Sequence, residues 1–137
     1  MGQRENLNAY LKSVKGKPFA WGQHDCLTFT NDAFRAMYGE GWADDWLNRY
    51  MVDGRPMRRN ELMREFKHSN FDIAVDKRLQ RVDCIPPMGA LVTTKKARKW
   101  VTGSAMGICI GTKLAFLDKA GVIYIPLDDI DKAWIKT

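Results

Sequence analysis

The stretch PFAWGQHDCLTF, residues 18–29, decides which fold can be expected for this 137-residue chain. Its first part contains Pro18 and Gly22, which favour a loop. From Cys26 onward, apolar residues recur at spacings of three and four, which predicts one buried stripe on a helix that ends at Gly39 or Gly41. The stripe consists of Cys26, Phe29, Ala33, Phe34 and Met37. Cys26 is therefore expected in the first turn of a mostly buried helix.

The first half of the chain is predicted to be mainly helical. Residues 5–14 carry apolar side chains at helical spacing, and residues 58–68 and 71–79 have the pattern of two short amphipathic helices. Residues 42–57 combine aromatic and charged residues with Gly and Pro, which predicts a loop with room for one helical turn.

The second half changes character. Short β-rich runs at residues 90–94, 106–110, 113–117 and 122–126 are separated by Gly, Lys or Asp, which predicts an antiparallel meander. Residues 128–136 are predicted to contain a last helical turn. Helices followed by strands indicate a single α+β domain over residues 1–137, with the helical first half packed on an antiparallel sheet.

The composition fits a domain with its own core, because 45% of the residues are hydrophobic and 11% are aromatic. The net charge of +6 favours an acidic partner, such as nucleic acid, an anionic cell-wall polymer or a negative protein surface. The N-terminus lacks the pattern of a secretory signal, and no run is apolar enough for a membrane span. We therefore expect synthesis in a cytoplasm and no membrane span.

The cysteines argue against a disulfide framework. Cys26, Cys84 and Cys109 are odd in number and have no C-x-x-C spacing, which also argues against a structural zinc site. Cys84 and Cys109 are interpreted as packing residues. No metal and no cofactor are expected.

Cys26 is the one residue whose position suggests chemistry. A helix N-terminus stabilises a thiolate through its unpaired N–H groups and its dipole, and a thiolate is the nucleophile of cysteine peptidases. The alternative is an inert thiol that packs in the core.

The segment Phe19-x-Trp21-Gly22-x-x-Asp25-Cys26-x-x-Phe29 resembles the surroundings of the nucleophile in NlpC-type papain-like cysteine peptidases, especially a compact group encoded among phage tail genes. In that family an Asp-Cys pair opens the central helix, and the thiolate attacks an amide of peptidoglycan stem peptides. Three further stretches resemble the family in order and spacing. They are residues 87–92, 105–111 and 126–134. The resemblance implies a papain-like fold.

The sequence also departs from the family's pattern at the catalytic histidine. The family's general base falls at Ala105, whose methyl group cannot take a proton. The third position of the triad falls near Leu117 or Asp118, and no complete triad is visible. His24 is a weak candidate base because it lies two residues before the nucleophile, and His68 is interpreted as a solvated helix cap.

A basic cluster follows the first predicted strand. A phosphate backbone could contact its cations while Trp100 stacks on a base, but a solvated hairpin loop or a contact with a neighbouring subunit is favoured because no nucleic-acid-binding motif accompanies it. Arg55, Arg58 and Arg59 have the same two interpretations. Trp21 is a further candidate binding residue. The cluster consists of Lys95, Lys96, Arg98, Lys99 and Trp100.

Three functions remain open, in this order of preference. The first is a non-catalytic assembly protein of a phage tail tip, assembled into the virion with other tail-tip or hub proteins. The second is an active cysteine peptidase that cleaves peptidoglycan during DNA entry, with His24 or a partner residue as base. The third, a nucleic-acid-binding module, rests on net charge alone, so nucleic acid is not the expected partner.

Overall fold

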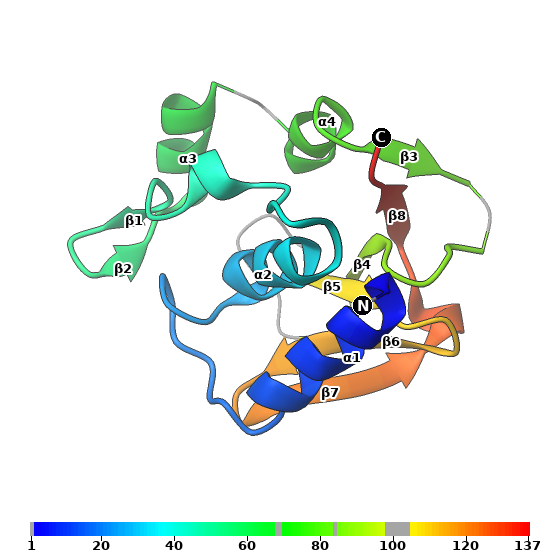
Figure 1. The fold of residues 1–137 in the computed structure, drawn as a ribbon. Helices are drawn as coiled ribbons and strands as arrows, with labels where there is room; N and C mark the ends of the chain where they lie inside the picture. The colour runs from blue at the N-terminus through cyan, green and yellow to red at the C-terminus, as the bar shows by residue number, and fades with distance from the viewer. Residues whose placement is uncertain (1, 68–69, 84, 98–104) are drawn as a thin grey trace.

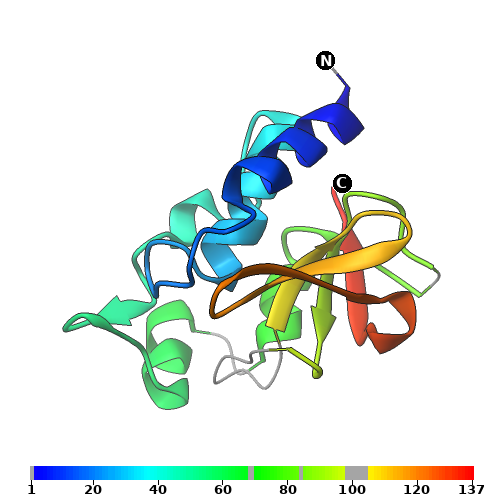
Figure 2. The ribbon, with the colours of Figure 1, turned by 90° about the horizontal axis from the view of Figure 1, so that it is seen from below.

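Two helices form one layer of the fold. A computed structural model describes residues 2–67, 70–83, 85–97 and 105–137. Helices α1 (Gln3–Val14) and α2 (Cys26–Tyr38) pack against each other and lie on one side of a sheet (Figures 1 and 2). Helix α2 ends as predicted at Gly39, whose φ of 84° is left-handed and suits a residue without a Cβ.

The second layer is an antiparallel sheet. Its described strands lie in the order β3-β8-β4-β5-β6-β7, and β4 to β7 form the predicted meander. The α+β class, with helices in the first half and most strands in the second, is thus confirmed. The strands are β3 (Gln80–Val82), β4 (Leu91–Thr94), β5 (Ala105–Cys109), β6 (Lys113–Asp118), β7 (Gly121–Pro126) and β8 (Lys132–Ile135).

The C-terminal segment differs from the prediction. Only η2 (Leu127–Asp129) is a helical turn, and β8 then inserts between β3 and β4. Ala133 and Trp134 of β8 are both buried but belong to different hydrophobic clusters, which is the two-residue alternation of a strand. The prediction of a helix there was wrong because pairing with two distant strands outweighs local preference.

The segment between α2 and β3 forms short elements. They are η1 (Asp44–Trp46), β1 (Met51–Val52), β2 (Arg55–Pro56), α3 (Arg59–Phe66) and α4 (Phe71–Asp76). The helical turn and the two helices were predicted, whereas the β1–β2 hairpin was not. Its turn uses Asp53 and Gly54 at φ 51° and 76°, the pair of left-handed residues that a tight hairpin requires.

The strand β5 separates two hydrophobic clusters. Met106 and Ile108 belong to the larger cluster with α1 and α2, whereas Ala105 and Cys109 belong to a second cluster with residues such as Phe116. Because successive side chains of a strand point to opposite faces, the two clusters lie on opposite faces of β5.

The absence of a side chain at Gly107 lets β5 and β6 approach closely, so we expect this position not to accept a larger residue. A Cβ there would lie 2.3 Å from the carbonyl oxygen of Ala115 and 2.6 Å from the Phe116 ring. We expect Gly107→Ala to lower the free energy of unfolding by about 1–3 kcal/mol, measured by urea denaturation. Gly16→Ala is the control, because no atom lies within 4 Å of its Cβ. Equal stability of the two variants would contradict this description of the β5–β6 contact.

Candidate functional site

The Asp25 side chain caps helix α2. Its Oδ1 accepts hydrogen bonds from the N–H groups of Leu27 (3.0 Å) and Thr28 (2.9 Å), and Thr28 Oγ1 accepts one from the Asp25 N–H (2.8 Å). This reciprocal arrangement is a capping box, which satisfies N–H groups that the helix itself cannot pair. The helix therefore begins at Cys26 because of Asp25.

The second carboxylate oxygen of Asp25 ties two loops to the helix. Oδ2 accepts from the N–H of Gly22 at 2.8 Å and from the hydroxyl of Tyr50 at 2.5 Å. Both Asp25 and Tyr50 are 0% exposed. Four donors thus surround one carboxylate, which satisfies its capacity to accept hydrogen bonds and compensates for its burial.

Tyr50 is a site residue that sequence reasoning missed. It lies in the predicted loop, where no periodic pattern marks it, and the Asp25 contact joins residues 25 positions apart. Burial raises the pKa of its hydroxyl above the usual range, and the negative charge of Asp25 raises it further. Tyr50 is therefore a donor to Asp25 at any physiological pH.

Cys26 opens α2 as predicted, but its thiol is enclosed. The residue is 5% exposed, and burial, with the nearby charge of Asp25, raises its pKa to about 12. N–H groups of Met106, Cys26 and Leu27 act in the opposite direction, yet burial outweighs them. Cys26 is consequently a neutral thiol at pH 7 instead of the thiolate expected at a helix N-terminus.

His24 lies within the core. Its ring is 2% exposed and meets the Phe29 ring edge to face at a centroid distance of 6.3 Å. Its Nε2 makes no hydrogen bond within the described part of the chain. Burial lowers the pKa of His24, the charge of Lys17 lowers it further, and Asp25 opposes both. The imidazole is thus neutral, and it packs against Phe29.

Ala105 is the first residue of β5 and pairs with Thr94. It is 2% exposed and belongs to the second hydrophobic cluster, whereas Cys26 belongs to the cluster that contains Met106. The strand itself does reach Cys26, because the N–H of Met106 acts on the thiol. The methyl group of Ala105 and the thiol of Cys26 thus belong to different hydrophobic clusters, on opposite faces of β5.

The predicted binding residues do not form one described surface. Trp21 is half-buried and lies edge to face with Phe19 at 5.0 Å. Lys95 and Lys96 are exposed directly after β4, and the Lys96 ammonium lies 3.9 Å from Asp129. The other predicted residues lie outside the described residues. These are Arg98, Lys99 and Trp100, together with His68 and Cys84.

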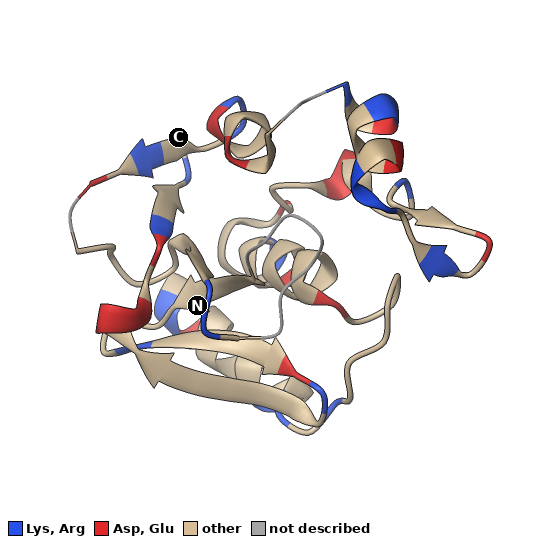
Figure 3. Cartoon of the chain, turned by 180° about the vertical axis from the view of Figure 1, so that it is seen from behind, with Lys and Arg blue, Asp and Glu red and all other residues tan. Residues whose placement is uncertain are grey.

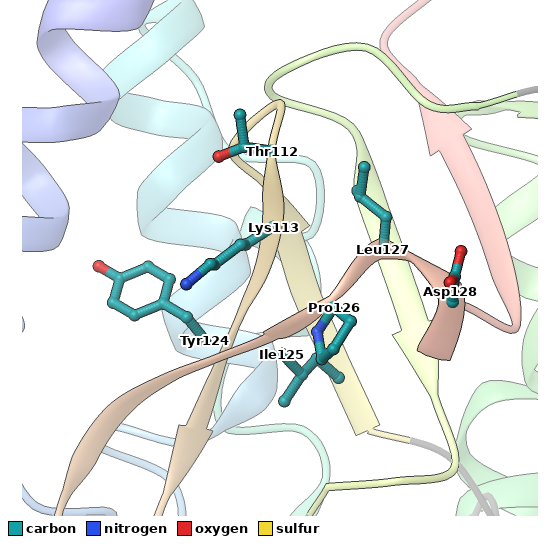
Figure 4. A pocket seen from close by; sticks show the side chains of 7 residues that line it. All are labelled: Thr112, Lys113, Tyr124, Ile125, Pro126, Leu127 and Asp128. Atoms are coloured by element: carbon teal, nitrogen blue, oxygen red, sulfur yellow. The ribbon is translucent and has the colours of Figure 1, made fainter.

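An open hollow of about 400 Å³ lies at the β6–β7 edge (Figure 4). Exposed Lys113 and Tyr124 contribute to its wall. Its lining contains none of the predicted catalytic residues and no buried polar side chain. The lining consists of Thr112, Lys113, Tyr124, Ile125, Pro126, Leu127 and Asp128.

Within the described residues, no cluster of three or more His, Cys, Asp or Glu side chains could hold a metal ion. No described helix is long and apolar enough to cross a membrane.

A family model described as a domain of unknown function, DUF6950, matches residues 2–135. The chain belongs to the DUF6950 family. No protein of curated function matches it. The matched region runs from α1 to β8 and therefore includes both layers of the fold and the Asp25–Cys26 pair.

The contacts of this DUF6950 domain predict that Asp25 matters more for folding than Cys26 does. Asp25→Ala removes the cap and the carboxylate oxygen that accepts from the Gly22 N–H and the Tyr50 hydroxyl, so we expect a loss of about 3–5 kcal/mol in the free energy of unfolding. Cys26→Ala removes one buried sulfur and should cost about 1 kcal/mol. Urea denaturation of both variants, with Tyr50→Phe as a single-hydroxyl control, measures the difference. Equal losses for Asp25→Ala and Cys26→Ala would contradict this assignment.

Burial of neutral His24 predicts a pH dependence of stability. Its pKa is lower in the folded chain than the ordinary value of 6.5. The unfolded chain therefore binds a proton first as the pH falls, and stability decreases below about pH 6.5. We expect His24→Leu to flatten the change in urea midpoint between pH 7.5 and pH 5. His68→Gln alters the other histidine, which the sequence predicts to be a solvated helix cap. It should leave the slope as in the wild type, and a slope that His24→Leu does not flatten would refute the assignment.

Proposed function

We propose that this DUF6950 domain is a non-catalytic assembly protein of a phage tail tip, built on an NlpC-type papain-like fold. Two observations support the proposal. The sequence around Asp25 and Cys26 resembles the compact NlpC-type group encoded among phage tail genes, and both residues of the pair have structural contacts in the folded chain.

The observation that carries the proposal is the enclosure of Cys26. Nucleophilic catalysis by cysteine needs a thiolate and a base within hydrogen-bond reach. Cys26 is 5% exposed with a pKa of about 12, and the nearby His24 packs its ring against Phe29. The carboxylate of Asp25 accepts from backbone and Tyr50 donors, so its role is to hold α2 and two loops.

An assembly role implies particular partners and a particular location. The partners would be other tail-tip or hub proteins, with peptidoglycan as a further possible contact. The chain would be made in the host cytoplasm and incorporated into the virion tail. Its net charge of +6 suits partners with acidic surfaces.

The competing function is an active peptidoglycan amide hydrolase, and an activity assay separates the two. We expect the purified wild-type protein to release no new amines from peptidoglycan. Cys26→Ala should be equally inactive. Ala105→His should stay inactive, because position 105 faces the second hydrophobic cluster and the thiol remains protonated. Hydrolysis by the wild type that disappears in Cys26→Ala would overturn the proposal.

Thiol labelling tests the same point without a substrate. At pH 7.5 iodoacetamide should alkylate Cys26 more than about 100-fold slower in the folded chain than in urea, because the thiolate fraction is far lower in the folded chain. Peptide mapping by mass spectrometry distinguishes Cys26 from Cys84 and Cys109. Fast labelling of folded Cys26 would indicate an activated nucleophile.

A further inference from the structure

The segment from Met51 to Lys67, which we call the basic arm, lies at one end of the fold and packs on the main core through Met51, Leu62 and Phe66. It contains the β1–β2 hairpin and α3, and both views show it at one end of the molecule, away from the sheet (Figures 1 and 2). No residue of the basic arm is fully buried. Its apolar side chains are partly buried, except for Met63, which is exposed. They are Met51, Val52, Pro56, Met57, Leu62, Met63 and Phe66.

The acidic residues of α3 form ion pairs with arginines outside the helix. Glu61 accepts two hydrogen bonds from the Arg55 guanidinium at 2.9 and 3.2 Å, and Glu65 accepts one from Arg49 at 3.2 Å. Arg49 also lies over the Phe66 ring at 4.8 Å, which ties α3 to the body of the domain. Both carboxylates of α3 are thus engaged in ion pairs.

One surface of α3, which we call its outer face, carries unpaired positive charge. Arg59 and Met63 share a side of the helix at four-residue spacing, Arg64 follows Met63, and Lys67 is the left-handed residue directly after the helix. All four are exposed, and Met63 is 42% exposed. The three cations make no ion pair with any described residue. Figure 3 shows the charged residues of this helix at the edge of the molecule.

Two of the arm's cations oppose helix formation. Exposed Arg58 is the N-cap residue of α3 and Arg59 its first residue, where the helix dipole favours negative side chains. Arg58 offsets part of this cost, because its charge acts together with the Arg55 guanidinium to lower the pKa of Glu61. Arg59 has no ion pair within the described residues, so its charge does not serve the stability of the helix.

We infer that the outer face of α3 docks on an acidic protein surface with an apolar centre. An exposed apolar side chain surrounded by charged ones is the arrangement of a protein interface, in which Met and Arg are enriched. Nucleic acid fits less well, because a phosphate backbone offers exposed Met63 no apolar contact, and no aromatic side chain on this face could stack on an unpaired base. A second copy of the chain fits less well too, because each copy carries a net charge of +6.

This inference rests on the proposed assembly role in one respect, namely that the chain has a protein partner. The two can fail separately. Peptidoglycan hydrolysis by a chain whose α3 binds the acidic probe would overturn the assembly role and leave the docking face. A chain that does not hydrolyse peptidoglycan and whose α3 does not bind the probe would overturn the docking face alone.

The probe is a synthetic helical peptide with one leucine stripe flanked by glutamates. We expect fluorescence anisotropy to detect its binding, with amide shifts in NMR spectra confined to residues of the basic arm. A second peptide, in which glutamines replace the leucines, should bind about 10-fold more weakly, because it offers Met63 no apolar contact. Binding should also weaken as salt increases.

Charge reversal provides a variant that keeps its fold. Arg58→Glu with Arg59→Glu places acidic residues where the dipole favours them, which offsets the lost attraction between Arg58 and Glu61, so α3 should stay folded while probe binding falls by about 10-fold or more. Lys113→Glu with Lys119→Glu is the matched control. It makes the same change in net charge at exposed positions at the two ends of the β6 strand, and it should bind the probe like the wild type.

Three results would overturn the inference. Equal loss in the two double variants would indicate attraction by net charge alone. Binding of a short DNA duplex to α3 as tightly as the peptide would indicate a phosphate-binding surface. Concentration-dependent dimerisation abolished by Arg58→Glu with Arg59→Glu would indicate a second copy as the occupant.

Discussion

The buried carboxylate of Asp25 is the group on which the first half of the fold depends. It joins three segments by hydrogen bonds: the start of α2, the loop at Gly22 and the loop at Tyr50. A buried carboxylate is costly unless donors surround it, and here three backbone N–H groups and the Tyr50 hydroxyl do so. The Asp25 interaction and the burial of Cys26 are thus parts of one arrangement.

This arrangement explains why a cysteine at a helix N-terminus is not activated. The helix dipole and three N–H groups favour the thiolate, but the enclosure by the core and the adjacent carboxylate favour the thiol more strongly. Position along a helix therefore predicts reactivity only when solvent reaches the sulfur. In this chain, the tight packing around α2 keeps solvent away from the Cys26 sulfur.

Much of the fold could be predicted from local pattern, and the failures have physical causes. The apolar stripe of α2 and the alternating runs of β4 to β7 are long enough to identify their elements. In contrast, β3 and β8 have three or four residues each and are defined by pairing with distant strands. The dipeptide Asp53-Gly54 is typical of a tight hairpin turn and could have predicted the β1–β2 hairpin. The mixed aromatic and charged composition of residues 42–57 led instead to the prediction of a loop.

The sequence predicted where the candidate site residues lie along the chain, but it did not predict what surrounds them in the folded protein. The sequence placed Asp25 and Cys26 at the start of α2, but the enclosure of Cys26 and the donor Tyr50 arise from residues far away in the chain. His24 could be recognised as close in sequence, whereas its orientation toward Phe29 depends on how the preceding loop closes on Ala20.

The alternation of β5 bears on how such a domain can evolve. Ala105 lies in a packed apolar cluster, so a larger, polar imidazole at that position would have to enter space that side chains such as Val92 and Phe116 now occupy. A single substitution would thus lower stability before it could provide a base. Several coordinated changes would therefore be needed before an imidazole could occupy this position, so the packing around the start of β5 limits which side chains the domain can accept there.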